Sequence, residues 1–219
     1  MKKEFWHERW ENDQIGFHQE EINPYLRTYW QSLTLAPNSL VFVPMCGKSL
    51  DMVWLRTQGH DVLGVELSPK AVSDFFGQFE HDPEKFSSGK FKGCKYDGIS
   101  ILCGDFFDLD FSKTGDVAAV YDRASLVALP PDMRKRYVDH LVQILPPEVL
   151  ILLITMEYPK AEMQGPPFSV TTREIKALYS PHGEVEALGQ FDVLSANPRF
   201  QERGLSALKE NIYLIRLHK

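Results

Sequence analysis

The chain has 219 residues, of which 43% are hydrophobic and 25% charged; this is the balance of a folded globular protein and excludes wholesale disorder. The formal net charge of −6 leaves no excess of Lys and Arg to neutralise a phosphate backbone, so we expect no nucleic-acid partner. No apolar run approaches the roughly 20 residues that cross a bilayer, and the N-terminal residues lack a secretory signal. We therefore expect a cytoplasmic protein with a single domain over residues 1–219 and no membrane partner.

Cysteine and histidine usage bears on redox state and metal binding. Cys46, Cys94 and Cys103 are odd in number and show no CxxC spacing, which indicates reduced thiols that serve in packing. The seven histidines form no HExxH or comparable pair. The sequence therefore predicts no protein-bound metal.

Residues 1–35 precede the first predicted strand and carry several aromatic side chains, among them Trp10 and Phe17. They lie ahead of a helix that Pro24 is suited to begin. We predict that this segment is a helical lid over the ligand site.

From about residue 40, short β-rich apolar runs alternate with helical patterns, which is typical of a mostly parallel sheet with helices on both faces. Seven strands are predicted, at residues 40–43, 61–66, 99–103, 117–121, 149–154, 185–194 and 211–217. The last two are expected to form an antiparallel edge. The lysine-, glycine-, serine- and aspartate-rich residues 81–98 predict a surface loop or excursion before the strand at residues 99–103.

Helices are predicted between these strands. Ser49 and Ser68 are suited to cap the first two, and Gly59 to end the first in a left-handed conformation. A third helix follows Pro131, and residues 171–179 predict a fourth.

In an open α/β sheet, ligands bind beyond the carboxyl ends of the strands, so the residues there are candidate ligand-binding residues. The first strand ends in a turn that contains Gly47, and the second ends in Glu66, which follows about 20 residues later. That spacing suits an acid that accepts hydrogen bonds from both ribose hydroxyls. The pair therefore indicates an adenosine nucleoside.

The next two strand ends add further candidates. Asp105 and Phe106 follow the third strand, where they are suited to meet an adenine amine and ring face. Arg123 follows the fourth. A dinucleotide fingerprint has three glycines and this turn has one, so NAD and FAD are disfavoured, whereas S-adenosylmethionine fits.

These residues resemble the thiopurine S-methyltransferase family, including its bacterial members, over nearly the whole chain. The matching segments are Gly16-Phe-His-Gln-Glu20, Val43-Pro-Met-Cys-Gly-Lys48, Gly59-His-Asp-Val-Leu-Gly-Val-Glu66, Tyr121-Asp-Arg-Ala-Ser-Leu126 and Gly165-Pro-Pro-Phe168. The resemblance implies a Rossmann-like class I methyltransferase that uses S-adenosylmethionine, releases S-adenosylhomocysteine and methylates aromatic or heterocyclic thiols. Selenium and tellurium species are further candidate acceptors.

The resemblance also assigns roles to individual residues. The implied cofactor-binding residues are Trp10, Met45, Gly47, Glu66, Asp105, Phe106 and Arg123, with Met45 where the family commonly has leucine. The implied acceptor-binding residues are Phe17, Pro166, Pro167 and Arg203. Arg123 and Arg203 are the predicted catalytic residues, because a guanidinium stays protonated and favours a neighbouring thiolate.

Plainer interpretations accompany several of these roles. Considered by itself, Glu66 could be an ordinary solvated acid at a strand end, and Trp10 could be a core residue. Arg123 could form a surface ion pair with Asp122. The Pro166-Pro167 pair suits a rigid loop. Alternative functions are a methyltransferase for small anions or aliphatic thiols and a non-catalytic module that binds S-adenosylmethionine. We expect a small-molecule thiol as the partner and a monomer in solution.

Overall fold

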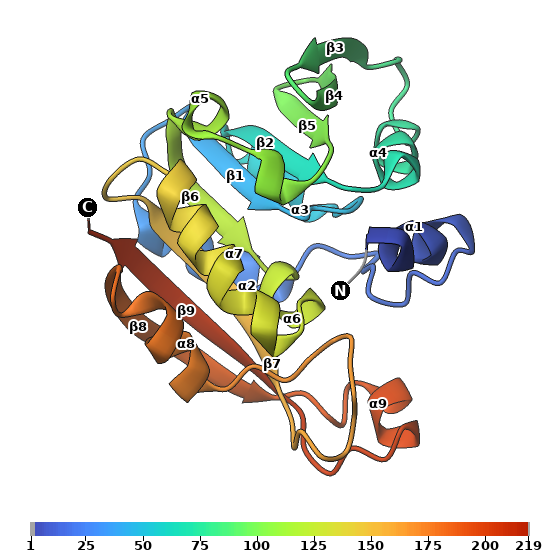
Figure 1. The fold of residues 1–219 in the computed structure, drawn as a ribbon, viewed down its shortest axis with the longest axis vertical. Helices are drawn as coiled ribbons and strands as arrows, with labels where there is room; N and C mark the ends of the chain where they lie inside the picture. Colours follow the sequence, from blue (N-terminus) through green and yellow to red (C-terminus); the bar gives the residue numbers. More distant parts are fainter. Residues whose placement is uncertain (1–2, 219) are drawn as a thin grey trace. The chain divides into compact units, whose positions relative to one another are not determined.

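The computed structural model describes residues 3–218, which form two compact units, one up to Tyr121 and one from Asp122 onward (Figure 1). The helices of the first unit are α1 (Lys3–Glu11), α2 (Pro24–Tyr29), η1 (Trp30–Leu33), α3 (Asp51–Thr57), α4 (Pro69–Phe76), η2 (Phe106–Asp108) and α5 (Phe111–Thr114). Its strands are β1 (Leu40–Pro44), β2 (Asp61–Glu66), β3 (Glu84–Ser88), β4 (Phe91–Tyr96), β5 (Ile99–Cys103) and β6 (Val117–Asp122), of which the last residue begins the second unit.

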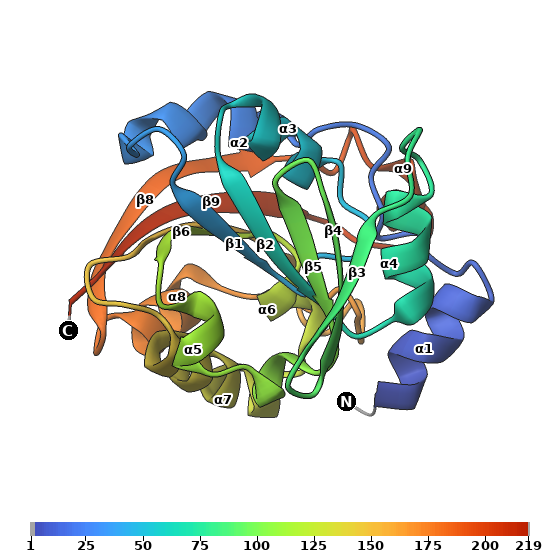
Figure 2. The ribbon, with the colours of Figure 1, turned by 90° about the horizontal axis from the view of Figure 1, so that it is seen from above.

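The sheet of the first unit has the strand order β3-β4-β5-β2-β1-β6. Strands β5, β2, β1 and β6 run parallel, and the register pairs Val43 with Gly64 and Glu66 with Cys103. Figure 2 shows α3 and α5 on opposite faces of these strands. The predicted parallel sheet with helices on both faces is confirmed, and the carboxyl ends of β1, β2 and β5 lie at one edge.

The predicted loop at residues 81–98 is wrong, because this segment forms the antiparallel hairpin β3–β4, which continues into β5. The described residues therefore contain nine strands instead of seven. Asp97 and Gly98, with φ of 43° and 73°, make the turn between β4 and β5, and an Asp-Gly pair is a strong hairpin signal. The loop was predicted because β3 is polar and exposed, so it lacks the apolar alternation that marks a strand.

Local capping fixes where the helices of the first unit begin. The side-chain oxygen of Asn23 accepts from the amides of Tyr25 and Leu26 at the start of α2, and Ser68 accepts from Ala71 at the start of α4. The cap predicted for Ser49 takes a different form, since α3 begins at Asp51, whose amide donates to Ser49 Oγ. Asn23 and Tyr121 also bind the buried Asp51, which ties α2 and β6 to α3.

The second unit contains the remaining elements. They are α6 (Ser125–Ala128), α7 (Pro131–Ile144), β7 (Leu150–Glu157), α8 (Thr172–Tyr179), β8 (Gly183–Asp192), α9 (Pro198–Glu202) and β9 (Lys209–Leu217). Strand β9 pairs antiparallel with both β7 and β8, so the predicted antiparallel C-terminal edge is confirmed. Along residues 3–218, no helix combines the length and apolar character needed to span a bilayer.

Candidate functional site

Glu66 closes the glycine turn of the first unit. One oxygen of its carboxylate accepts from the amide of Gly47 at 2.9 Å, and the other accepts from the amide of Ser68 at 2.7 Å. The side chain is only 7% exposed, so the interpretation of Glu66 as a solvated acid is wrong. Burial raises the pKa of this carboxyl, and the amide hydrogen bonds oppose the rise. The ends of β1 and β2 are thereby joined at one acid.

The turn itself is a strained backbone feature. Gly47 has a φ of 54°, and Met45 has a φ of 48°, a conformation that a bulky residue rarely adopts. A Cβ atom on Gly47 would lie 3.2 Å from the Trp10 ring, so only glycine lets the ring approach this closely. Trp10 is 3% exposed and therefore takes a buried position directly over the turn.

Asp105 connects the end of β5 to the N-terminal helix. Its Oδ1 accepts from the amide of Phe107, and its Oδ2 lies 2.6 Å from Lys3 Nζ. The hydrogen bond and the charge of Asp105 raise the pKa of Lys3. A second ion pair joins Asp13 to Lys70 at 3.4 Å. Both pairs hold the α1 segment against the strand-end edge of the first unit, beside α4 (Figure 1).

Phe106 and Phe17 occupy different environments in the first unit. The ring of Phe106 is buried and stacks on Phe42, with ring centroids 6.5 Å apart. Phe17 is 40% exposed and meets Trp6 and Trp10 edge to face, at 5.6 Å in both cases. Phe17 therefore presents apolar surface next to the tryptophan that covers Gly47.

The thiol of Cys46 lies inside this site without the features of a nucleophile. The side chain is buried, and burial together with the charge of Glu66 raises its pKa well above the ordinary value. A thiol of this kind stays protonated at neutral pH. No group of three or more His, Cys, Asp or Glu within residues 3–218 is arranged to hold a metal ion.

Asp122 ends β6, and Arg123 follows it at the start of the second unit. Asp122 is fully buried and accepts from Tyr137 Oη at 2.6 Å and from the amide of Ser125. Arg123 is half-buried and immediately precedes the turn into α6. Burial raises the pKa of Asp122 from 3.8 to about 6, against the effect of its hydrogen bonds.

This shift gives a testable pH dependence. Between pH 3.8 and about 6 the folded protein keeps a proton on Asp122 that the unfolded chain has released, so the free energy of unfolding falls as pH rises through this window. At about 1.4 kcal/mol per pKa unit, the loss amounts to about 3 kcal/mol. We expect Asp122→Asn, which carries no charge, to remove this fall when unfolding by denaturant is measured from pH 4 to pH 7. The control Asp116→Asn, which changes an exposed carboxylate, should show the same pH dependence of unfolding as the unmodified protein. Identical profiles for Asp122→Asn and the unmodified protein would contradict the assignment of this pH dependence to Asp122.

The Gly165-Pro-Pro-Phe168 segment is held from two directions within the second unit. Tyr158 Oη donates to the carbonyl of Pro167 at 2.6 Å, and the amide of Phe168 donates to the carbonyl of Val127 at 2.7 Å. Pro166 and Pro167 remain half-buried. The loop is thus anchored to the end of β7 on one side and to α6 on the other.

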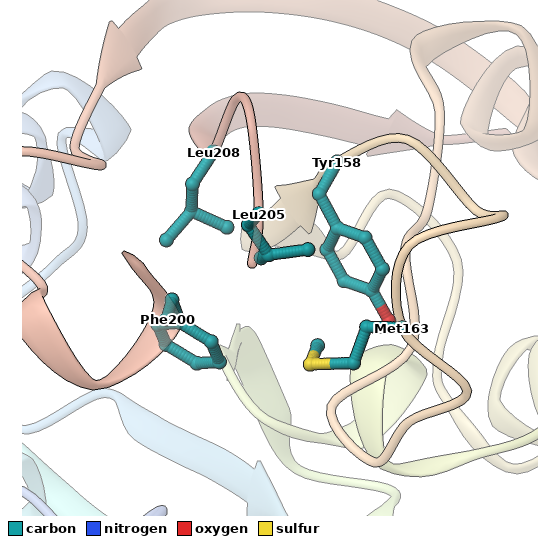
Figure 3. Packing of buried hydrophobic residues seen from close by; sticks show 5 residues of the cluster. All are labelled: Tyr158, Met163, Phe200, Leu205 and Leu208. Atoms are coloured by element: carbon teal, nitrogen blue, oxygen red, sulfur yellow. The ribbon is translucent and has the colours of Figure 1, made fainter. Parts of the chain in front are cut away.

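Arg203 follows α9, which packs through a hydrophobic cluster onto the same region. The cluster consists of Tyr158, Met163, Phe200, Leu205 and Leu208 (Figure 3). Arg203 itself is exposed. Burial raises the pKa of Tyr158, and the positive charges of Arg134 and Arg203 are close enough to oppose the rise. Tyr158 thus donates a hydrogen bond to Pro167 and also lies within the electrostatic influence of Arg203.

Three residues with a place in these arrangements were missed by sequence reasoning. Lys3 reaches Asp105, Tyr158 reaches Pro167, and Arg134 is buried between α6 and residue Ser169. Lys3 and Tyr158 carry no local pattern that marks them. Arg134 lies on the apolar face of α7, where an arginine is unusual, and this was the one available signal.

Comparison with known proteins identifies close relatives. A family described as Thiopurine S-methyltransferase matches residues 1–218. The chain is 58% identical over 215 residues to a thiopurine S-methyltransferase of Nitrosospira multiformis, with 98% of each chain covered. It is 49% identical to a thiopurine S-methyltransferase of Pseudomonas aeruginosa, with 98% of this chain and 99% of the relative covered.

Solved structures with much lower identity share the fold. One is the 1,6-didemethyltoxoflavin-N1-methyltransferase of Burkholderia thailandensis, with bound S-adenosylhomocysteine. It has a TM-score of 0.66 at 14% identity, and the match covers 99% of this chain and 87% of that one. The geranyl diphosphate C-methyltransferase of Streptomyces coelicolor, also with S-adenosylhomocysteine, has a TM-score of 0.65 at 13% identity, and the match covers 98% of this chain and 97% of that one. The Rossmann-like methyltransferase fold is thereby confirmed.

Proposed function

The chain belongs to the thiopurine S-methyltransferase family and is an S-adenosylmethionine-dependent S-methyltransferase, and we propose that acidic heteroaromatic thiols are its preferred acceptors. Cofactor binding is supported mainly by the turn at Gly47, where the Gly47 amide donates to Glu66 and the Trp10 ring packs against the glycine. A relative at 58% identity over nearly its whole length supports the S-methyltransferase reaction.

The residues at the glycine turn fit an adenosine-containing cofactor. Gly47 has a positive φ and no Cβ, so the Trp10 ring packs directly on its backbone, and Glu66 offers buried carboxylate oxygens beside this turn. We assign cofactor binding to Trp10, Met45, Gly47, Glu66, Asp105, Phe106 and Arg123. S-adenosylmethionine supplies a methyl group on a sulfonium, and the chain's own residues orient the two reactants and exclude water.

The acceptor side is assigned to Phe17, Pro166, Pro167 and Arg203. Aromatic and proline surfaces suit a flat heterocycle, while the guanidinium groups of Arg123 and Arg203 lower the pKa of a nearby thiol. Because a heteroaromatic thiol ionises easily, neither arginine needs to act as a base. Alignment of two reactants accounts for roughly 7 to 11 kcal/mol of barrier lowering in well-oriented systems, so the main task of these residues is positioning.

The wider organisation is part of the same proposal. Residues 1–35 act as a lid within a single methyltransferase domain, supported by the contacts of Lys3 and Trp10 with Asp105 and Gly47. The protein works as a cytoplasmic monomer on small molecules, without nucleic acid, membrane or metal. The net charge of −6 supports the exclusion of nucleic acid. Selenium and tellurium species are additional acceptors to be tested.

The experiment that tests the function uses one preparation of the whole protein. Calorimetric titration with S-adenosylhomocysteine and with NAD is followed by addition of a thiopurine and labelled S-adenosylmethionine. We expect the protein to bind S-adenosylhomocysteine and not NAD. We also expect the labelled methyl group to appear on the sulfur of the thiopurine. Binding without transfer to any thiol would instead favour a non-catalytic binding module.

Phe17→Ala separates heteroaromatic acceptors from small ones. Phe17 offers exposed ring surface, so its loss should raise KM for a thiopurine about tenfold, in line with the roughly 1.5 kcal/mol attributed to good aromatic pairs, and leave KM for hydrosulfide unchanged. Phe111→Ala, at another exposed phenylalanine, is the control and should change neither value. An unchanged KM for the thiopurine in Phe17→Ala would instead favour a small-anion or aliphatic-thiol methyltransferase.

A further inference from the structure

Arg134 is a buried cation whose donors serve backbone carbonyls. It lies on α7 with 0% of its surface exposed. Its Nε donates to the carbonyls of Leu126 and Leu129, at 3.1 and 3.0 Å. Its Nη1 donates to the carbonyl of Ser169 at 3.3 Å and to Glu174 at 2.5 Å. One guanidinium therefore touches two segments far apart in sequence.

Both segments belong to the assigned acceptor and catalytic region. Leu126 and Leu129 lie in and just after α6, the helix that begins two residues after Arg123. Ser169 directly follows the Pro166-Pro167-Phe168 run. The amide of Phe168 also donates to the carbonyl of Val127, so the guanidinium reinforces a direct contact between the same two segments. The centre of the guanidinium lies 6.0 Å from the Phe168 ring.

Core stability alone does not account for a charged residue here. Desolvating a guanidinium is costly, and well-packed apolar side chains often serve a core as well or better. Glu174 is the carboxylate that neutralises Arg134, and it is itself partly exposed and shared with Lys160. The planar fork of Arg134 instead matches carbonyls that come from different directions, which a lysine ammonium cannot reach together.

We propose that Arg134 is a positioning residue that sets the spacing between the Arg123 turn and the Pro166-Pro167 loop and so determines affinity for the thiol acceptor. It acts through these backbone segments without touching either reactant. The inference rests on the proposed acceptor roles of Arg123, Pro166 and Pro167. The remaining nitrogen, Nη2, has no hydrogen-bond partner among residues 3–218.

The test compares Arg134→Lys with Leu141→Ala. Leu141 is a fully buried residue on the same helix, and its side chain has no hydrogen-bonding group that could hold either segment. Measurements are KM and kcat for a thiopurine, Kd for S-adenosylhomocysteine and the melting temperature. We expect Arg134→Lys to raise KM about tenfold or more while Kd changes less than about threefold, because displacement of the Pro166-Pro167 loop weakens binding of the acceptor and leaves the cofactor turn in place. Leu141→Ala should lower the melting temperature and leave KM unchanged.

A milder variant keeps the test decisive if Arg134→Lys does not fold. Glu174→Gln retains an acceptor for Nη1 but removes the charge that holds the guanidinium, so KM should rise by about threefold. An unchanged KM in whichever of the two variants folds, or a parallel rise in KM and Kd, would overturn the positioning role. If the unmodified protein methylates no thiopurine, the proposed acceptor class has failed instead.

Discussion

Replacing Glu66 with alanine is expected to raise Kd for S-adenosylhomocysteine about 100-fold. The carboxylate accepts from the amides of Gly47 and Ser68, and it offers the assigned oxygens for a ribose. Hydrogen bonds to a charged group contribute about 1.5 to 3 kcal/mol each, and about 2.7 kcal/mol corresponds to a hundredfold change in Kd. Calorimetric titration of the variant and the unmodified protein measures the effect directly.

Two control variants show whether the effect belongs to the carboxylate. Glu66→Gln keeps one acceptor oxygen and should give an intermediate Kd, whereas Glu84→Ala, on the exposed strand β3, should leave Kd unchanged. A melting temperature measured alongside separates weakened binding from lost structure. An unchanged Kd in a folded Glu66→Ala protein would remove Glu66 from the cofactor site.

Replacing Arg203 with alanine is expected to lower kcat/KM for acidic thiols by about tenfold or more and to leave Kd for S-adenosylhomocysteine unchanged. A guanidinium lowers the pKa of a neighbouring acid, so its removal leaves less of the bound thiol ionised. The pH at which kcat reaches half of its maximum should therefore move upward. Initial rates measured from pH 5 to pH 9 with saturating S-adenosylmethionine test this.

Arg199 supplies the matched control for Arg203. It lies on α9, and burial together with the positive charge of Arg203 lowers its pKa, so the two guanidinium groups are near neighbours. Its side chain also lies over the Phe200 ring, 4.9 Å from the centroid. Arg199→Ala should change kcat/KM less than Arg203→Ala. Equal losses in turnover and in cofactor affinity for Arg203→Ala would undo the division of roles between Glu66, assigned to the cofactor, and Arg203, assigned to the acceptor.

Local patterns predicted most of the fold. The predicted strand at residues 61–66 coincides with β2, and Ser68 and Pro69 begin α4 as expected. The hairpin β3–β4 is the main exception, although Asp97-Gly98 carried a local turn signal. Apolar periodicity, caps and turn residues depend on interactions between residues that are close in the chain, so local sequence patterns predict them.

The candidate site was predictable only where strand ends carry it. Gly47 and Glu66 stand at the ends of neighbouring parallel strands, and that topology brings them within hydrogen-bond distance. The direction of the Phe106 ring toward Phe42 was not predictable, because the strand-end position constrains the backbone and leaves the side chain to packing.

By itself, the sequence determined the α/β class, the order of the seven predicted strands, the glycine turn with its acid, and the family. Tertiary structure alone decided that Lys3 reaches Asp105, that Asp122 is buried with a pKa of about 6, and that Arg134 joins α6 to the segment after Pro167. These features depend on burial and on contacts between residues distant in the chain. Such contacts leave no periodic or short-range pattern, because each arises only when separate elements pack together.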